Sequence, residues 1–248
     1  MNGPLERLPV ALALVLGLSP LMAWAPETRV HMVDEAIRFM PASLRTAFES
    51  HRRDLLRGML APMAREDGPG HRPPWSDGRL DDTLEREAYW LLETLAQPTS
   101  FDEIAERFGS VAHYVADAGF PPGASRGDGA SRYSHFARFC QDRRERFPLV
   151  FYGHDDAALA ADDYCEFARQ QMQRAGEDDR ELARAYAAAG DPPDPAAFDD
   201  RSVPFAVGSL AYSRSITNIV RVWLHIWNRA NGDMGRTPYR TESESRGG

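Results

Sequence analysis

The chain has 248 residues, of which 43% are hydrophobic and 27% are charged, and this suits one domain with a sizeable apolar core. Its formal net charge of -8 disfavours binding to duplex DNA, which depends on neutralising phosphates with basic side chains. All 29 basic residues are arginine, so catalysis that needs a lysine amine, such as a Walker A phosphate loop or a Schiff base, is excluded.

The first 23 residues have the pattern of a secretory signal peptide. A short polar start precedes an apolar run over residues 8–22, which is shorter than the ~20 residues that a transmembrane helix needs. Cleavage after Ala23 predicts a secreted or periplasmic protein whose mature chain begins with a free amino group on Trp24. An uncleaved segment that anchors the chain to a membrane is the alternative.

Apolar residues at helical spacing predict that most of the remaining chain is helical. In the first helix Val30, Val33, Ile37 and Met40 follow this spacing, and Pro41 ends the run. The predicted helices cover residues 27–40, 43–60, 81–95, 101–118, 132–146, 156–175, 178–189 and 205–230.

Loops rich in proline and glycine are predicted at residues 61–79 and 120–130, and only residues 148–152 look like a strand. The pattern predicts an all-α fold: a single-domain multi-helix bundle over residues 24–231. Residues 232–248 are predicted to be a disordered tail because they carry too few apolar side chains.

The two cysteines, Cys140 and Cys165, are too few for a zinc knuckle or a disulfide scaffold. They fit either one disulfide bond in an oxidising compartment or two buried thiols.

Histidines are the residues best suited to carry chemistry. His113 and Asp117 lie four positions apart, so they share one face of the predicted helix 101–118, which begins after a capping box at Ser100 and Glu103. This pair fits a metal site, and it equally fits a buried histidine bonded to its aspartate.

Three further histidines favour the metal site: His31, His71 and His135. They belong to separate predicted elements, and zinc ligands of the nitrogen and oxygen type converge from separate elements.

The sequence resembles the zinc-dependent phospholipase C and S1/P1 nuclease superfamily over most of residues 24–231. The resemblance rests on Trp24 followed by His31, on the segment FGSVAHYVADAGFPP, on YSHFARF and on the long segment SLAYSRSITNIVRVWLHIWNRANGD. Members of that superfamily are secreted, all-helical phosphodiesterases with up to three zinc ions. The resemblance therefore implies an all-helical, zinc-dependent hydrolase.

The resemblance also implies a role for individual residues. It places one zinc ion on the amino nitrogen and carbonyl oxygen of Trp24, on His31 and on Asp117. It places a second ion on His71, His113 and Asp117, so that Asp117 bridges the two ions.

Three departures from the family pattern remove the third zinc site. Met63 stands where the family has an aspartate, Gly123 where it has a histidine, and Phe139 where it has the glutamate of an HxxxE pair. That site keeps only His135, which matches the histidine of the pair. The resemblance thus predicts two zinc ions instead of three.

Two zinc ions that share a carboxylate lower the pKa of a bound water towards ~7 and neutralise charge on phosphorus, which suits phosphodiester hydrolysis. Glu66 or Asp67 is the candidate to complete the second site or to act as the base. The expected substrate is a phospholipid head group or another phosphodiester, reached through transient contact with a membrane surface.

Three alternatives remain open at the sequence level. The chain fits a weakened or inactive zinc-binding relative, because ligands are missing, and it fits a single-strand nuclease. The segment GASRG also matches the GxSxG motif with Ser125 as nucleophile, but that motif needs a strand before it, and two prolines precede it here.

Overall fold

The starts of several helices follow from their local sequence. In this computed structural model, which describes residues 23–64, 67–124, 130–190 and 197–240, the first helix begins at Pro26 with Glu27 in its first turn. Proline supplies the helical φ angle at that position, and the carboxylate favours the positive end of the helix dipole. Another helix begins after Asp163, whose side chain accepts a hydrogen bond from the Glu166 backbone N–H.

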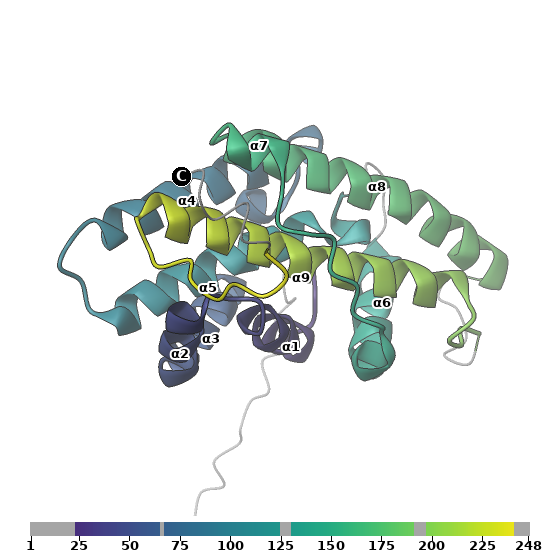
Figure 1. Cartoon of the computed structure of the whole chain (residues 1–248). Coiled ribbons are helices and arrows are strands. Elements are labelled where there is room, and N and C mark those ends of the chain that lie inside the picture. Colours follow the sequence, from purple (N-terminus) through teal and green to yellow (C-terminus); the bar gives the residue numbers. More distant parts are fainter. Residues whose placement is uncertain (1–22, 65–66, 125–129, 191–196, 241–248) are drawn as a thin grey trace, which may run out of the picture.

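The described residues form nine α-helices (Figure 1), and no strand occurs among them. Their bounds are α1 Pro26–Ile37, α2 Ala42–Ser50, α3 Arg52–Leu60, α4 Leu80–Leu95, α5 Phe101–Ala118, α6 Ala130–Arg143, α7 Ala157–Ala160, α8 Tyr164–Ala189 and α9 Val203–Arg229. Short 3-10 helices lie at Ala61–Ala64, Gly68–His71, Pro74–Ser76, Pro121–Ala124 and Arg144–Arg146. The predicted all-α fold is confirmed.

Individual elements differ from the sequence prediction. The predicted helix 43–60 is two helices, α2 and α3, which meet where the backbone of His51 leaves the helical region. The region 156–189 holds the short α7 and then α8, which continues through Gly176. Ser100 precedes α5 as predicted, but its side chain makes no capping bond to that helix. Residues 148–152 pair with no strand in the described chain.

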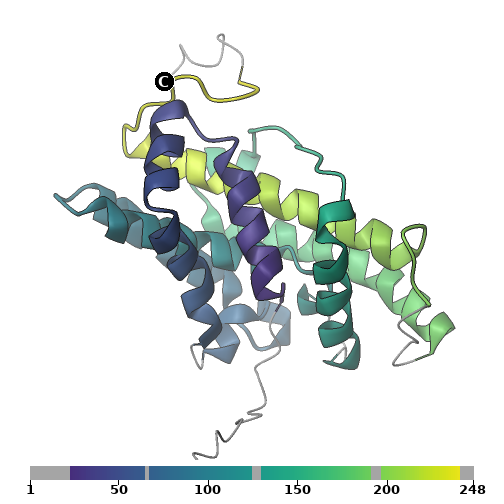
Figure 2. The same ribbon diagram turned by 90° about the horizontal axis from the view of Figure 1, so that it is seen from below.

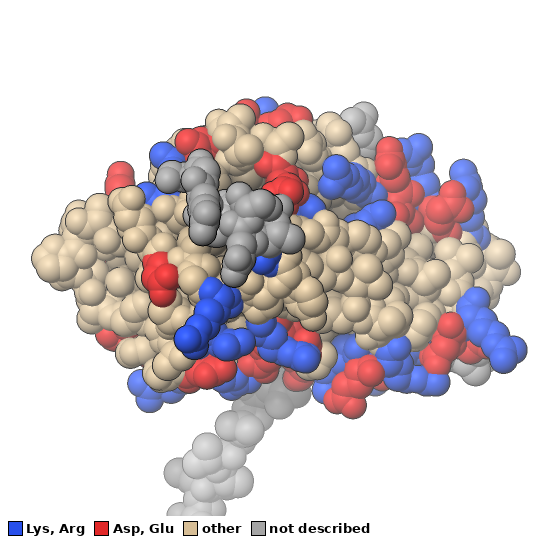
Figure 3. Space-filling model, viewed as in Figure 1, with Lys and Arg blue, Asp and Glu red and all other residues tan. Residues whose placement is uncertain are grey.

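Helix α5 lies at the centre of the molecule, in contact with α3, α4, α8 and α9. The two longest helices, α8 and α9, run side by side, and Figure 2 shows α1 and α6 next to each other across α9. On the face shown in Figure 3, arginines and carboxylates are interspersed along the edges, and a broad band of uncharged surface lies between them.

Two tryptophans fix α5 within the core. The indole N–H of Trp223 on α9 donates to the Phe108 carbonyl at 2.9 Å, and that of Trp24 donates to the Ala116 carbonyl at 3.0 Å. Both tryptophans are fully buried, so each indole satisfies its donor while it covers α5 with apolar area.

Glycines let α3 and α5 approach backbone to backbone. A Cβ atom on Gly58 would lie 1.8 Å from the Glu106 carbonyl oxygen, and one on Gly109 would lie 2.0 Å from the Leu55 carbonyl oxygen. Only glycine fits at such contacts. The crossing brings the last turn of α3 against the middle of α5.

The segment after α9 packs on the fold as far as residue 240. The Ala42 backbone N–H donates to the Gly235 carbonyl at 3.3 Å, and the Tyr239 ring lies 5.8 Å from that of Phe39. The rest of the predicted tail, residues 241–248, and most of the predicted signal peptide lie outside the described residues.

Within the described part of the chain, no helix combines the length and the apolar character needed to cross a membrane. Cys140 and Cys165 are both free thiols, and burial raises the pKa of Cys140 well above its usual value.

Candidate metal centre

The centre of the site is the face of α5 that carries His113 and Asp117. The Nδ1 atom of His113 lies 2.8 Å from the carbonyl oxygen of Met59, which belongs to the last turn of α3. Carbonyls at the end of a helix have no partner within it, so this one accepts the imidazole N–H. The bond fixes the tautomer of His113 and leaves its Nε2 lone pair directed away from α3.

His71 reaches the same point from the loop before α4. It ends the 3-10 helix Gly68–His71, and its Nδ1 lies 2.7 Å from Asp117 Oδ2 and 3.3 Å from His113 Nε2. The side chain of His71 is 20% exposed, whereas those of His113 and Asp117 are 1% and 3% exposed. Solvent therefore reaches the cluster from the side of His71.

The donor set of this cluster fits one metal ion. One ligand atom each from His71, His113 and Asp117 lies within 4.8 Å of the other two. Two imidazole nitrogens and a carboxylate oxygen form a set that binds zinc and leaves a fourth position open. The bond from His113 to Met59 is the kind of outer contact that orients a histidine ligand.

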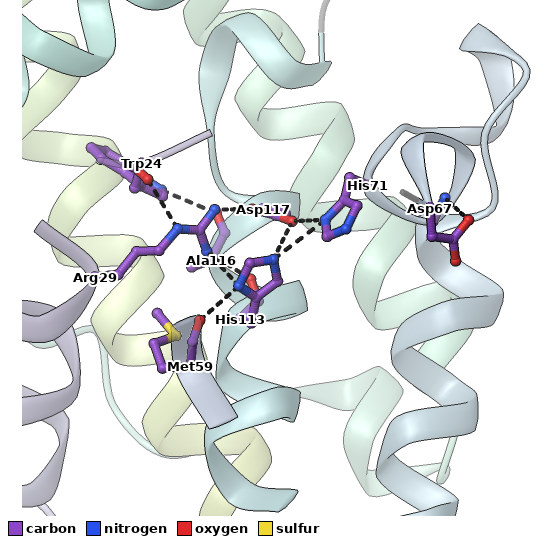
Figure 4. Close-up of polar contacts among 9 residues, drawn as sticks. Trp24, Arg29, Met59, Asp67, His71, His113, Ala116 and Asp117 are labelled. Atoms are coloured by element: carbon purple, nitrogen blue, oxygen red, sulfur yellow. Dashed lines mark hydrogen bonds and ion pairs between the residues drawn. The ribbon is translucent and has the colours of Figure 1, made fainter. Parts of the chain in front are cut away.

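Arg29 of α1 occupies the opposite edge of Asp117, as Figure 4 shows. Its Nε donates to the Trp24 carbonyl at 2.9 Å, one terminal nitrogen bonds Asp117 Oδ1, and the other lies 3.3 Å from the His113 carbonyl. Arg29 is buried, as are Trp24 and Asp117. The two oxygens of Asp117 thus have different partners, the guanidinium at Oδ1 and the imidazoles at Oδ2.

This arrangement sets the charges in the site. Burial acts to raise the pKa of Asp117, but the positive Arg29 and the polar contacts of His113 and His71 outweigh it and hold that pKa well below its usual value. Burial, followed by the charge of Arg29, lowers the pKa of His113. The carboxylate is therefore ionised and His113 neutral, which are the forms that bind a metal.

We expect the metal-free protein to lose stability as the pH falls below about 6.5, because the pKa of His113 is lowered from 6.5 in the folded chain. The unfolded chain then takes up a proton at this residue that the folded chain does not bind. Urea unfolding with a chelator at about pH 7.5 and about pH 5.5 measures the loss. His113→Gln should show a smaller loss, since His225, whose pKa is also lowered, titrates in both proteins. Equal losses would contradict the assignment.

The other residues of the predicted site have different surroundings. Nδ1 of His31 shares a hydrogen bond with the Tyr212 hydroxyl, and Nδ1 of His135 lies 2.7 Å from the Tyr186 hydroxyl. The carbonyl of Trp24 is bound to Arg29. Neither histidine belongs to the cluster of ligand atoms that His71, His113 and Asp117 form.

The two predicted acids lie near His71 in sequence. Asp67 accepts hydrogen bonds from the Gly70 backbone N–H at 3.3 Å and from Arg79 at 2.7 Å, so it shapes the loop that presents His71. Glu66 lies outside the described residues.

The sequence analysis did not find Arg29 or Tyr133. Arg29 lies four positions before Val33 and eight before Ile37, so helical spacing places it on the buried face of α1, which was a usable signal. Burial raises the pKa of Tyr133, and the charge of Asp117 adds to the shift. Tyr133 thus stays protonated next to the site, and no sequence pattern marked it.

A second group of possible ligands is less suited to a metal. Asp81, Asp82 and Cys165 also bring three donor atoms within 4.8 Å of one another. Arg169 already pairs with Asp81 at 2.7 Å, and burial raises the pKa of Cys165 to about 12, which keeps it a thiol.

Comparison with known proteins supports the fold. No family model matches the chain, and no curated protein matches it. Among solved structures it is similar to the alpha-toxin of Clostridium perfringens from avian strain SWCP, with a TM-score of 0.61 and 12% identity over 88% of this chain and 66% of that one. It is also similar to the alpha-toxin of Clostridium absonum, with a TM-score of 0.59 and 13% identity over 91% of this chain and 67% of that one.

The chain thus spans about two thirds of the length of these toxins. At this level of identity the likeness concerns the fold, and it supports the all-helical fold of the phospholipase C superfamily that the sequence resemblance implied.

Proposed function

We propose that the chain is a secreted, zinc-dependent phosphodiester hydrolase of the phospholipase C type, with one metal ion held by His71, His113 and Asp117. The convergence of three ligand atoms from a loop and from α5 within 4.8 Å carries the proposal. The resemblance of the sequence and the likeness of the fold to the alpha-toxins support it.

The donor set supports one ion, where the resemblance implied two. The carbonyl of Trp24 and Oδ1 of Asp117, which the resemblance assigned to the other ion, are bound to the Arg29 guanidinium. His31, the remaining ligand of that ion, pairs with Tyr212. A second ion therefore does not fit the arrangement of these residues.

When bound, zinc would lower the pKa of a coordinated water and polarise a phosphoryl oxygen. The protein supplies the rest. Met59 holds the His113 ring, and Arg29 holds Asp117 in its ionised form. The protonated hydroxyl of Tyr133, next to Asp117, is suited to donate a hydrogen bond to a phosphate oxygen. Asp67 or Glu66 is our candidate for the residue that accepts a proton.

The phosphodiester is proposed to be a phospholipid head group, reached at a membrane surface. The interspersed charges on the face in Figure 3 and the net charge of -8 do not favour a duplex nucleic acid. A signal peptide cleaved after Ala23 would direct the chain to the periplasm or the medium.

Metal-dependent hydrolysis tests the proposal. Purified protein, stripped with a chelator and reloaded with zinc, is assayed with phosphatidylcholine vesicles and with single-stranded DNA. We expect release of phosphocholine that needs zinc. Cleavage of the DNA alone would favour the nuclease alternative, and a zinc-loaded chain without turnover on either substrate would favour an inactive relative.

His71→Ala is the matching variant. We expect zinc affinity to fall by about 100-fold or more, because a ligand is lost, and hydrolysis to fall with it. The unfolding free energy of the metal-free chain should change by only about 1 kcal/mol, because the side chain is partly exposed and loses one hydrogen bond. Isothermal titration with zinc and urea unfolding measure the two effects. His51→Ala, which removes a histidine outside the cluster, should leave zinc affinity unchanged.

A further inference from the structure

The most unusual feature of the site is the buried guanidinium of Arg29. A buried charge is costly unless it is paired and its donors are satisfied. Arg29 meets this condition through the Trp24 carbonyl at 2.9 Å, the His113 carbonyl at 3.3 Å and the Asp117 carboxylate.

The position of Arg29 relative to Asp117 is that of a second cation. A carboxylate that bridges two cations gives one oxygen to each, and here Oδ2 faces the imidazoles while Oδ1 faces Arg29. The other partner of Arg29 is a backbone carbonyl, which is also a ligand type for hard cations. The guanidinium therefore binds the same kind of oxygen atoms that a metal ion would bind at this point.

We propose that Arg29 is a built-in cation that takes the place of one metal ion and makes this a centre of one metal and one guanidinium. Arg29 fixes the direction of Oδ2 towards His71 and His113, and it occupies the space in which another ion would sit. It is a positioning residue, because its burial keeps it from touching a substrate. This inference rests on the metal centre of the proposed function, but it concerns metal binding and does not require turnover.

The substitutions of Arg29 separate its charge from its volume. Arg29→Ala opens the space and frees the Trp24 carbonyl and Asp117 Oδ1, so this variant should bind a second equivalent of zinc. Arg29→Met fills much of the same space with an apolar side chain and should not. Arg29→Lys keeps a positive charge near Asp117 and should bind one equivalent, as the unchanged protein does.

Zinc stoichiometry is measured by elemental analysis after dialysis and by titration, on the unchanged chain and on the three variants. Methylguanidinium, added at millimolar concentration to Arg29→Ala, should displace the second equivalent and restore thermal stability.

Two saturable equivalents on the unchanged chain would overturn the inference, even if no variant folds. So would a stoichiometry of Arg29→Ala equal to that of Arg29→Met. One equivalent on a chain without hydrolytic activity would leave this inference standing and would count against the proposed function, so the two failures are distinct.

Discussion

Asp117→Asn should remove zinc binding and destabilise the metal-free chain by about 3–5 kcal/mol, the usual cost of leaving a buried charge without its partner. The side chains of Asp117 and Arg29 are 3% and 1% exposed, so water does not replace the lost carboxylate. Asparagine has the same shape but no charge, which isolates the electrostatic contribution. Urea unfolding in a chelator and elemental analysis measure the two effects.

Asp34→Asn is the matched control for this variant. Asp34 pairs with Arg52 through two contacts of 2.7 Å, but both side chains are more than a third exposed. Solvent screens such a pair, so we expect a loss below about 1 kcal/mol. Adding Arg29→Met to Asp117→Asn should recover stability, because no unpaired charge then remains buried. An Asp117→Asn variant as stable as Asp34→Asn would show that Arg29 and Asp117 are not coupled as described.

Gly109→Ala should destabilise the chain by about 3 kcal/mol, at the upper end of the range for overpacking. The new methyl group would lie 2.0 Å from the Leu55 carbonyl oxygen and 2.7 Å from the Met59 nitrogen. The gain in helix propensity of about 1 kcal/mol does not offset such a clash, so α3 must move away from α5. Zinc affinity should then fall as well, because the Met59 carbonyl that orients His113 moves with α3.

Gly176→Ala in α8 is the control for helix propensity. Its new methyl group would lie 3.3 Å from the Ala124 carbonyl oxygen, a contact that a small shift relieves. We expect the unfolding free energy to change by less than about 1 kcal/mol. Unfolding in urea and titration with zinc compare the two alanine variants, and equal effects would contradict the close crossing of α3 and α5.

Local patterns predicted α5 and α1 well. The predicted helix 101–118 coincides with α5, because its apolar stripe is long and Gly119 follows it. The division between α2 and α3 was missed because no proline or glycine marks it, and the chain turns at His51, whose ring packs on Phe101 at 5.2 Å. Helix α8 was predicted as two helices because Gly176 and the acidic residues after it read as a break, which packing on α4 and α9 overrides.

The candidate site was predictable where its residues are close in sequence. His113 and Asp117 follow from helical spacing, whereas His71 depends on the family resemblance and on the path of a loop. Arg29 was not recognised because an arginine on an amphipathic helix usually belongs to its solvated face. Its role depends on the Trp24 carbonyl and on Asp117, 88 positions further along the chain, and spacing within α1 carries no information about either.

The late position of α9 in the chain has a consequence for biosynthesis. Trp223 packs between the rings of Phe48 and Phe108, at 5.0 and 6.1 Å, and its indole bonds the backbone of α5. While the chain is being translated, α5 and its ligand residues leave the ribosome with this apolar face bare, and the face stays bare until Val203–Arg229 follows. The nascent polypeptide must therefore be shielded from aggregation, by chaperones or by immediate export, until its last helix closes the core.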